Sequence, residues 1–299
     1  MAISESQLDT WSKQGSVTQS QATYATVRTC LEASDAPYAG RSKSIFLQGS
    51  YGNDTNIYAD SDVDVVIVTD SVFYHGSDDL TPAEKTAINA VLKGGGGYTY
   101  DDFKKDVLTQ LTKKFGNAVK PGKKAIFIKG EGNRRDTDVL PAVAYRRYTR
   151  FRTYDDSDYY EGITFWTTAG VQIINYPKYH SANATSKHQN TNGWYKPTVR
   201  IFKNMRNSMI VKGYLAEGVA PSYFFGGHAL QRTDQFVRDE LRRHMRERDQ
   251  LAFEVRSRQA RLHQRALLPA ARQLAGVLEP GRLRDLPCCC DQVLERVVI

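Results

Sequence analysis

Two aspartates, Asp62 and Asp64, stand one residue apart at the start of an apolar, β-branched run in the stretch GSYGNDTNIYADSDVDVVIV, which begins at Gly49. Alternate residues of a strand project to the same face, so the two carboxylates would lie side by side about 6 Å apart. Adjacent carboxylates repel one another unless a cation or a proton lies between them. Ligands that are all oxygen suit Mg²⁺, which keeps several waters and also binds substrate phosphates.

A third carboxylate on an adjacent strand would complete a site for two metal ions. The stretch DTDVLPA offers Asp138, with Asp136 two residues earlier. In such a site one ion activates an attacking hydroxyl, and the other holds a triphosphate and the leaving pyrophosphate. The alternative interpretation is that Asp62 and Asp64 only cap a turn, but the wider pattern disfavours it.

The pair Gly49-Ser50 lies twelve residues before the two aspartates and predicts a phosphate contact. Glycine lets the backbone approach a ligand closely. Backbone N–H groups together with the Ser50 hydroxyl can then hold phosphate oxygens. Carboxylates for metal and a Gly-Ser turn for phosphate together predict a site that binds a triphosphate through metal ions.

The elements that would position these residues alternate between helices and strands, as expected of a mixed α/β (α+β) fold. The stretches DSVFYHGSDDLT (70–81) and HSANATSKHQNTNG (180–193) are expected to be polar loops. Apolar periodicity predicts helices over 4–34, 82–93, 99–115 and 196–210, and strands over 44–48, 63–68, 125–129, 138–151, 162–166 and 171–176.

Composition sets the broad class of protein. A chain of 299 residues can form two lobes. Its first residues lack the basic and apolar regions of a secretory signal, and no apolar run approaches the ~18 residues of a membrane span. We therefore expect a cytoplasmic protein that contacts no membrane. The formal net charge of +8 favours polyanionic partners such as nucleotides.

The last quarter of the chain differs sharply in composition from the rest. Residues up to Gly226 contain 17 Lys and 10 Arg, whereas residues 227–299 contain no Lys and 14 Arg. Its apolar positions still allow an amphipathic helix. We predict three regions: a catalytic core at 1–180, the start of a helical lobe at 181–226, and an atypical Arg-rich helical tail at 227–299.

The motifs resemble a known family. Gly-Ser followed by the Asp-x-Asp pair and a distal Asp is similar to the polymerase-β-like nucleotidyltransferase superfamily. A closer resemblance is to the cGAS/DncV-like nucleotidyltransferases, the cyclic-oligonucleotide synthases of bacterial anti-phage defence. It is carried by the longer stretch QGSYGNDTNIYADSDVDVVI together with DVLPA, GITFW, YPKYH and YKPTVRIFKNMRN. The resemblance covers roughly residues 1–226. It implies a mixed-sheet catalytic core braced by a helical lobe.

The same resemblance implies an activity. It is the Mg²⁺-dependent joining of nucleoside triphosphates, ATP among them, into a cyclic di- or trinucleotide, with Mn²⁺ able to replace Mg²⁺. The product would be a second messenger that reaches a downstream effector, and no nucleic acid would be obligatory.

The resemblance also implies roles for individual residues. Asp62, Asp64 and Asp138 would bind the metal ions, with Asp138 preferred over Asp136 because it occupies the Asp of DVLPA. Gly49 and Ser50 would contact the triphosphate, and Lys203 in RIFKN would reach the phosphates. In PSYFF, Ser222 would touch the triphosphate and Tyr223 would stack on a base. The alternatives are a solvated helix lysine at Lys203 and a core aromatic at Tyr223.

Two other function classes remain open from the residues alone. One is a different template-independent nucleotidyltransferase, acting on an RNA end or a small molecule. The other is a catalytically silent protein that binds nucleotides or nucleic acid through a basic surface made by Arg134, Arg135, Arg146, Arg147, Arg150 and Arg152.

Overall fold

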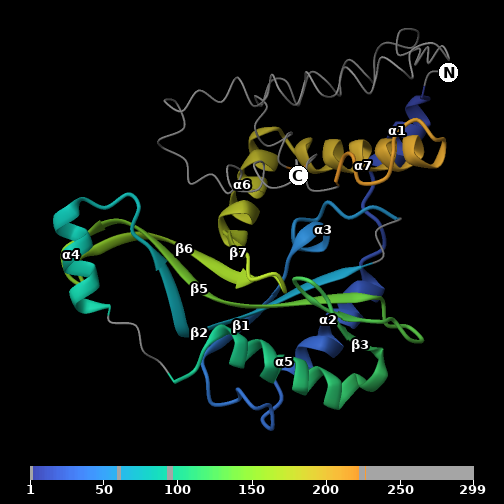
Figure 1. The fold of residues 1–299 in the computed structure, drawn as a ribbon. Helices are drawn as coiled ribbons and strands as arrows, with labels where there is room; N and C mark the ends of the chain where they lie inside the picture. Colours follow the sequence, from blue (N-terminus) through green and yellow to red (C-terminus); the bar gives the residue numbers. More distant parts are fainter. Residues whose placement is uncertain (1–2, 59–61, 93–96, 222–225, 227–299) are drawn as a thin grey trace. The chain divides into compact units, whose positions relative to one another are not determined.

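The computed structural model describes residues 3–58, 62–92, 97–221 and 226 (Figure 1). The chain divides into two compact units. One unit is made by residues 15–183, and the other by residues 1–14 together with residues from 184 onward. No helix among the described residues has the length and apolar content needed to cross a bilayer.

Seven strands within the described residues form one mixed sheet in the unit of residues 15–183. The order β1–β2–β5–β4–β3 runs through β1 (Lys43–Leu47), β2 (Val63–Gly76), β5 (Thr137–Phe151), β4 (Ile126–Ile128) and β3 (Val119–Pro121). The distal part of β5 pairs with β6 (Ser157–Trp166), which pairs with β7 (Gln172–Asn175). Only the central pair, β2 and β5, is parallel; the other pairs are antiparallel. The fold class predicted from the sequence is confirmed.

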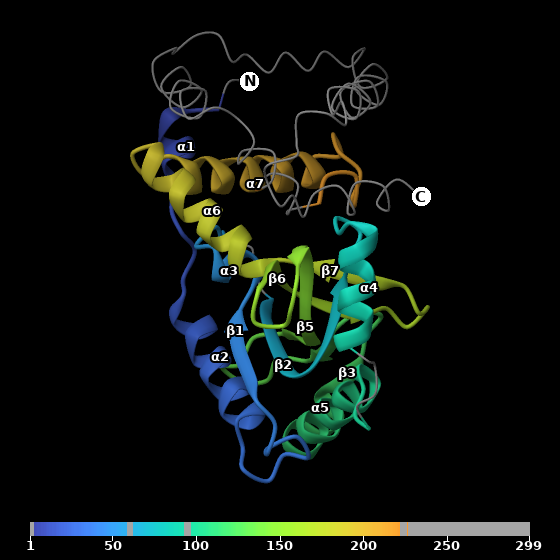
Figure 2. The same cartoon turned by 90° about the vertical axis from the view of Figure 1, so that its left-hand side faces the viewer.

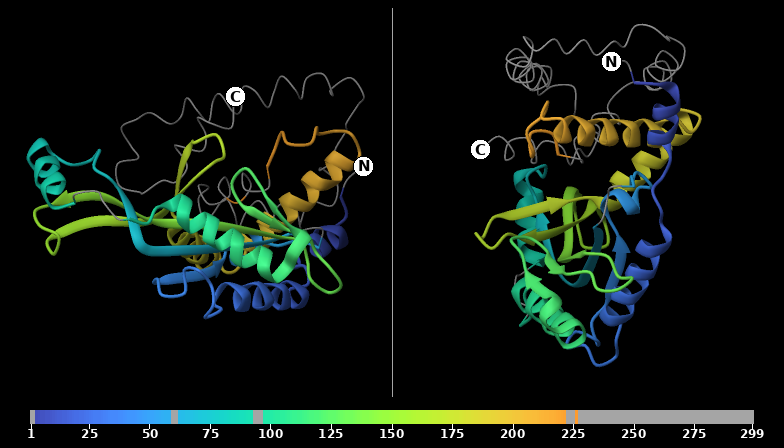
Figure 3. Two further views of the ribbon diagram at one scale, coloured as in Figure 1. Left: turned by 60° about the horizontal axis from the view of Figure 1, so that its bottom comes forward. Right: turned by 90° about the vertical axis from the view of Figure 1, so that its right-hand side faces the viewer.

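Two helices, α2 (Thr18–Leu31) and α5 (Tyr100–Phe115), pack side by side on one face of this sheet (Figures 1 and 3). Their apolar positions, among them Val27, Phe103 and Val107, are fully buried with the strand residues in one core cluster. The remaining element beside β1 and β2 is α3 (Gly49–Gly52), a single helical turn formed by the Gly-Ser motif.

The strands β2, β5 and β6 continue well beyond the central core (Figure 3). Helix α4 (Pro82–Val91) packs on their distal part, where Leu80, Ile88, Tyr148 and Phe151 form a separate buried cluster. A capping box fixes the start of α4, because Thr81 and Glu84 each accept a hydrogen bond from the other's backbone N–H.

The other unit contains α1 (Glu5–Ser12), the end of α6 (Pro177–Asn190) and α7 (Tyr195–Val211). The short 3₁₀ turn η1 (Gly116–Ala118) follows α5 and belongs to the unit of residues 15–183. Helices α1 and α7 lie side by side (Figure 2), and Leu8 and Ile201 are buried together. Asn204 donates a hydrogen bond to the carbonyl of Trp11 at 3.1 Å, which ties the two helices together.

Three expectations about elements were wrong. The single helix predicted over 4–34 is broken between α1 and α2, because Gly15 exchanges hydrogen bonds with Asn56 and a Cβ at Gly15 would stand 2.6 Å from the carbonyl oxygen of Ile57. The loop predicted over 70–81 is mostly strand, since β2 extends to Gly76. The loop predicted over 180–193 is largely helix α6.

Candidate active site

The candidate site is built on the one parallel strand pair of the sheet. Asp64 is the second residue of β2 and Asp138 the second residue of β5, and the two are direct partners in the β2–β5 ladder. Partners in a ladder project to the same face of the sheet from backbones about 4.8 Å apart. Strand geometry therefore places these two carboxylates next to each other, as the sequence predicted.

The two remaining carboxylates flank this pair. Asp62 precedes β2 and is exposed, whereas Asp138 is half-buried. The pKa of Asp138 lies above its ordinary value because burial disfavours the charged form, and because the negative charges of Asp62 and Asp136 are near. The cluster thus carries electrostatic repulsion in the protein alone.

Asp136 makes two hydrogen bonds that hold the start of β5 in place. Its carboxylate accepts a hydrogen bond from the backbone N–H of Gly130 at 2.5 Å, and its carbonyl accepts one from Val63 at 3.0 Å. These bonds close the connection between β4 and β5 and align β5 with β2. They support the preference for Asp138 over Asp136 as the third carboxylate.

The Gly-Ser motif lies against the same carboxylates. Gly49 has a φ of +65°, and a Cβ built on it would overlap Oδ2 of Asp64. Gly52 is also constrained, since its Cβ would stand 2.6 Å from the carbonyl oxygen of Leu47. Both glycines let α3 pack closely on β1 and β2, and the half-buried Ser50 directly follows the glycine that lies against Asp64.

The donor set fits a divalent cation of the Mg²⁺ type. It consists of carboxylate oxygens only, and a cation among them would favour the charged form of Asp138, whose pKa is raised by burial and by the charges of Asp62 and Asp136. Within the described ranges, no three Asp, Glu, His or Cys side chains are gathered closely enough to ligate one ion in the conformation seen. Asp62, Asp64 and Asp138 are the residues that would hold it.

The other site residues predicted from the sequence come after residue 183, outside the unit that carries the carboxylates. Lys203 lies on α7 in the second unit and is only 5% exposed, so the alternative of a solvated helix lysine is wrong. A buried ammonium group requires a partner, and Lys203 has one. Ser222 and Tyr223 lie outside the described residues.

Three of the six arginines considered for a basic surface, Arg147, Arg150 and Arg152, are paired with aspartates. Arg147 forms two hydrogen bonds with Asp79, at 2.7 and 3.1 Å. Arg150 contacts Asp156 at 2.6 Å and Asp158 at 2.7 Å. The guanidinium of Arg146 stacks on aromatic rings, with its Cζ 4.7 Å from the ring centres of Phe73 and Tyr159. This arrangement weakens the alternative of a nucleic-acid-binding surface.

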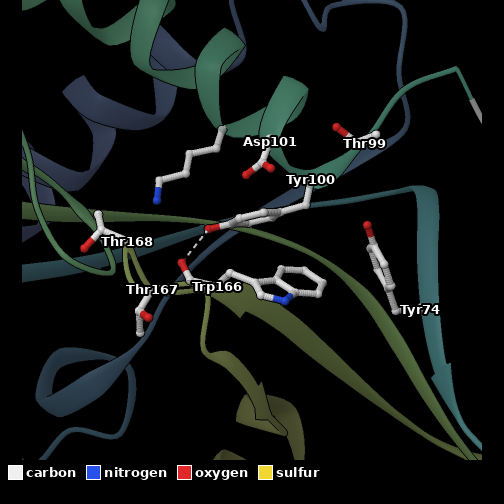
Figure 4. Close-up of a pocket in the computed structure, with 9 residues that line it drawn as sticks. Tyr74, Thr99, Tyr100, Asp101, Trp166, Thr167 and Thr168 are labelled. Atoms are coloured by element: carbon white, nitrogen blue, oxygen red, sulfur yellow. Dashed lines mark hydrogen bonds between the residues drawn. The ribbon is translucent and has the colours of Figure 1, made fainter.

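A cavity of about 340 Å³ lies on the other face of the sheet (Figure 4). Its aromatic wall is made by Tyr74, Tyr100 and Trp166, with ring centres of neighbouring pairs 4.8 and 4.9 Å apart. The hydroxyl of Tyr100 donates to the carbonyl of Trp166 at 3.2 Å. Trp166 projects away from Asp138, since it shares a face with Val143, five residues along β5. This cavity is separate from the carboxylates.

Two residues near the carboxylates were missed by the sequence reasoning. Tyr51, within α3, is 8% exposed, and its hydroxyl accepts a hydrogen bond from Nη1 of Arg135 at 3.1 Å. Arg135 was considered only as part of a basic surface. The one signal in the sequence was the position of Tyr51 directly after Ser50.

A family model matches part of the chain. The model describes the cGAS/DncV-like nucleotidyltransferase C-terminal helical domain, and it matches residues 182–246. The match starts next to the predicted start of the helical lobe at residue 181, and it continues past residue 226 into the Arg-rich segment.

Individual relatives match most of the chain. A cyclic UMP-AMP synthase from Rhodothermus marinus is 40% identical over 226 residues, which is 75% of this chain and 74% of that protein. A cyclic nucleotide synthase from Staphylococcus haemolyticus is 36% identical over 228 residues, or 75% of each chain.

A solved structure is similar as well. The structure of the Rhodothermus marinus c-UMP-AMP synthase with Apcpp and Upnpp superimposes with a TM-score of 0.68 at 37% identity, covering 78% of this chain and 76% of that one.

Proposed function

This chain belongs to the cGAS/DncV-like nucleotidyltransferases, and on that premise we propose that it joins nucleoside triphosphates into a cyclic di- or trinucleotide with release of pyrophosphate. The observation that carries the proposal is the 40% identity to a cyclic UMP-AMP synthase over 226 residues. The Asp64–Asp138 ladder pair beside the Gly-Ser turn supports it, because this arrangement of groups suits nucleotidyl transfer.

The reaction forms a phosphodiester at each step. A ribose hydroxyl of one nucleotide attacks the α-phosphorus of another, the bond from that phosphorus to the β-phosphate oxygen breaks, and pyrophosphate leaves. The hydroxyl proton passes to solvent or to a carboxylate of the site. Repetition within the bound linear intermediate closes the ring.

Residues of this chain would bind and orient the reacting groups. Asp62, Asp64 and Asp138 would hold Mg²⁺, or Mn²⁺ in its place. The bound ions would supply Lewis-acid activation of the hydroxyl and charge neutralisation at the phosphates. The Ser50 hydroxyl would donate a hydrogen bond to a triphosphate oxygen, and the absence of a side chain at Gly49 leaves Asp64 room beside it.

Relatives of similar identity differ in the bases that their names specify. They include synthases named for UMP-AMP, for dipurine and for dipyrimidine products, at 40%, 33% and 33% identity. We therefore propose that this chain joins nucleotides into a ring, without specifying which bases the product contains. We also expect the product to act as a second messenger that reaches a separate effector in anti-phage defence.

The test is incubation of the full chain with all four ribonucleoside triphosphates and Mg²⁺ or Mn²⁺, followed by phosphatase treatment and mass spectrometry. A cyclic product lacks terminal phosphates and survives the phosphatase without any added acceptor. Asp138→Asn serves as the control for contaminating activity. Products that form only when an RNA or a small-molecule acceptor is added would replace this proposal with another nucleotidyl transfer.

A further inference from the structure

The Gly-Ser turn is short and needs support from outside its own backbone. Helix α3 contains four residues, so its internal bonds are few: Gly52 and Asn53 donate to the carbonyls of Gln48 and Gly49, each at 3.2 Å. A single helical turn is not stable in isolation. Its orientation must be set by tertiary contacts.

Tyr51 provides a side-chain contact between the turn and a segment distant in the sequence. It is the residue after Ser50, its ring is 8% exposed, and it belongs to the main core cluster. Its hydroxyl accepts the hydrogen bond from Nη1 of Arg135 at 3.1 Å. A buried tyrosine hydroxyl that meets a cationic donor makes one of the stronger kinds of hydrogen bond in proteins.

Arg135 is itself held from two sides. Its backbone N–H donates to Oγ1 of Thr23 in α2 at 3.0 Å, and its carbonyl accepts from Oγ1 of Thr137 at 3.1 Å. Thr137 is fully buried and is the first residue of β5. Asp138 follows it directly. Arg135 therefore belongs to the segment that fixes where β5 and its carboxylate begin.

The Tyr51–Arg135 bond thus connects the two halves of the candidate site. On one side it ends one residue from Ser50, and on the other it ends three residues from Asp138. Tyr51 and Arg135 are 84 residues apart in the sequence. The backbone N–H of Gln48 ties the start of the turn to the carbonyl of Asp64 at 2.9 Å, and the Tyr51–Arg135 bond ties the turn to the segment that leads into Asp138.

We propose that Arg135 and Tyr51 are positioning residues: their hydrogen bond sets the Gly49–Ser50 turn relative to Asp138, and so aligns a bound triphosphate with the carboxylates. The inference rests on the proposed nucleotidyl transfer. Neither residue touches the substrate in this account. Misplacing a reacting group by about 1 Å costs on the order of 10²-fold in rate, so a modest shift of the turn is enough to slow the reaction.

The cleanest variant is Tyr51→Phe, which removes the hydroxyl while keeping the ring in the core and the guanidinium charge of Arg135 in place. Any effect is then positional and not electrostatic. Tyr100→Phe is the matched control, because Tyr100 is also buried, at 3% exposed, and its hydroxyl also makes a hydrogen bond across the fold, here as the donor to the carbonyl of Trp166 on the opposite face of the sheet. Arg135→Lys keeps the charge but loses the planar fork.

Steady-state kinetics on the full chain form the first measurement. Tyr51→Phe should lower kcat by about 10- to 100-fold and change the KM for triphosphate by less than about 3-fold, because alignment affects the reacting geometry more than ground-state binding. Tyr100→Phe should keep the wild-type kcat. Arg135→Lys should resemble Tyr51→Phe, and the double variant should be no slower than the slower single one, since both changes break one bond.

Hydrogen exchange provides a second measurement that needs no activity. The amides of Asn53 and Thr55, which donate to Gly49 and Ser50, should exchange faster in Tyr51→Phe than in the wild type, and at the wild-type rate in Tyr100→Phe. Wild-type kcat and unchanged exchange in Tyr51→Phe would overturn the inference. A wild-type protein that forms no nucleotide product overturns the proposed function instead, and exchange then still decides whether the bond holds the turn.

Discussion

Gly49 lies directly against the carboxylate of Asp64, so that a Cβ at residue 49 would overlap this carboxylate. The backbone of Gly49 also has a positive φ, +65°, which other residues adopt at a cost. Glycine is therefore needed at residue 49 for two independent reasons, the positive φ of the turn and the close approach of the Asp64 carboxylate.

Gly49→Ala should therefore lose activity more than stability. Displacement of the Asp64 carboxylate should lower product formation by about 10²-fold or more, and backbone strain should cost roughly 1–3 kcal/mol of unfolding free energy. The matched control is Gly170→Ala, where φ is +76° and open space surrounds the Cβ position. The control should lose stability and keep activity. Measurements of the melting temperature and of product by mass spectrometry separate the two effects, and equal activity in both variants contradicts the prediction.

The two late aspartates should respond differently to amidation. Asp138→Asn removes a charge that burial and neighbouring carboxylates disfavour, so the fold should be at least as stable at neutral pH while product formation falls by about 10³-fold or more. Asp136→Asn weakens the bond to Gly130, so it should lower the melting temperature and affect the rate much less. The opposite order of rates would show that Asp136 is the third ligand.

Removal of metal should abolish activity and also change stability. In the wild type, adding millimolar Mg²⁺ to chelator-treated protein should raise the melting temperature, because a ligand that binds only the folded state stabilises it. The double variant Asp62→Asn, Asp64→Asn should show no such rise and should form no product while remaining folded. Full activity in the double variant would refute the assignment of these two residues to the metal.

A stability change with pH is expected at the distal end of the sheet. The pKa of Glu84 is lowered to about 2, because its carboxylate accepts hydrogen bonds from the Thr81 side chain and from the backbone N–H groups of Thr81 and Phe151. A lowered folded-state pKa gives stability that is present above the ordinary value of 4.5 and is lost as pH falls toward 2. The melting temperature of Glu84→Gln should lie below that of the wild type at pH 7, and the difference should shrink between pH 4.5 and 2. A difference that is constant across this range would show that protonation of Glu84 is not the cause.

The Arg-rich segment is testable by truncation. Its composition predicts that residues after Gly227 are dispensable for Mg²⁺-dependent binding of a non-hydrolysable triphosphate, although their loss should lower solubility and stability. The family model extends to residue 246, so a chain ending at Arg246 and a chain ending at Gly227 form a matched pair. Binding by both chains supports the prediction. If the chain that ends at Gly227 is folded but does not bind the triphosphate, part of the nucleotide pocket lies between residues 228 and 246.

The sequence predicted the proximity of Asp64 and Asp138 better than it predicted the elements around them. Asp64 and Asp138 could be found because strands impose a simple alternation, and because both residues open a run of apolar residues. The extension of β2 to Gly76 could not be read from DSVFYHG, because its side chains are half-exposed and the pattern is that of a polar loop. The core of the sheet is apolar, but the distal strands are stabilised by local packing on α4.

The break between α1 and α2 illustrates a second limit. The apolar spacing through residues 4–34 is continuous with one helix, and Gly15 is the one local sign of an interruption. Helix α1 ends at Ser12, and Gly15 in the break pairs with Asn56, 41 residues away. The same holds for Arg135, whose partner Tyr51 is 84 residues distant. Hydrogen bonds between residues that are this far apart in the chain produce no periodic pattern in the sequence.

The direct pairing of Asp64 with Asp138 has an evolutionary consequence. The spacing of the two carboxylates comes from the regular separation of adjacent strands, and the short segment with Arg135 and Asp136 sets the register of β5 on β2. Insertions or substitutions in more distant loops can therefore accumulate without changing the separation of these two carboxylates. The names of similar proteins specify UMP-AMP, dipurine and dipyrimidine products, so base choice varies at 33–40% identity to this chain.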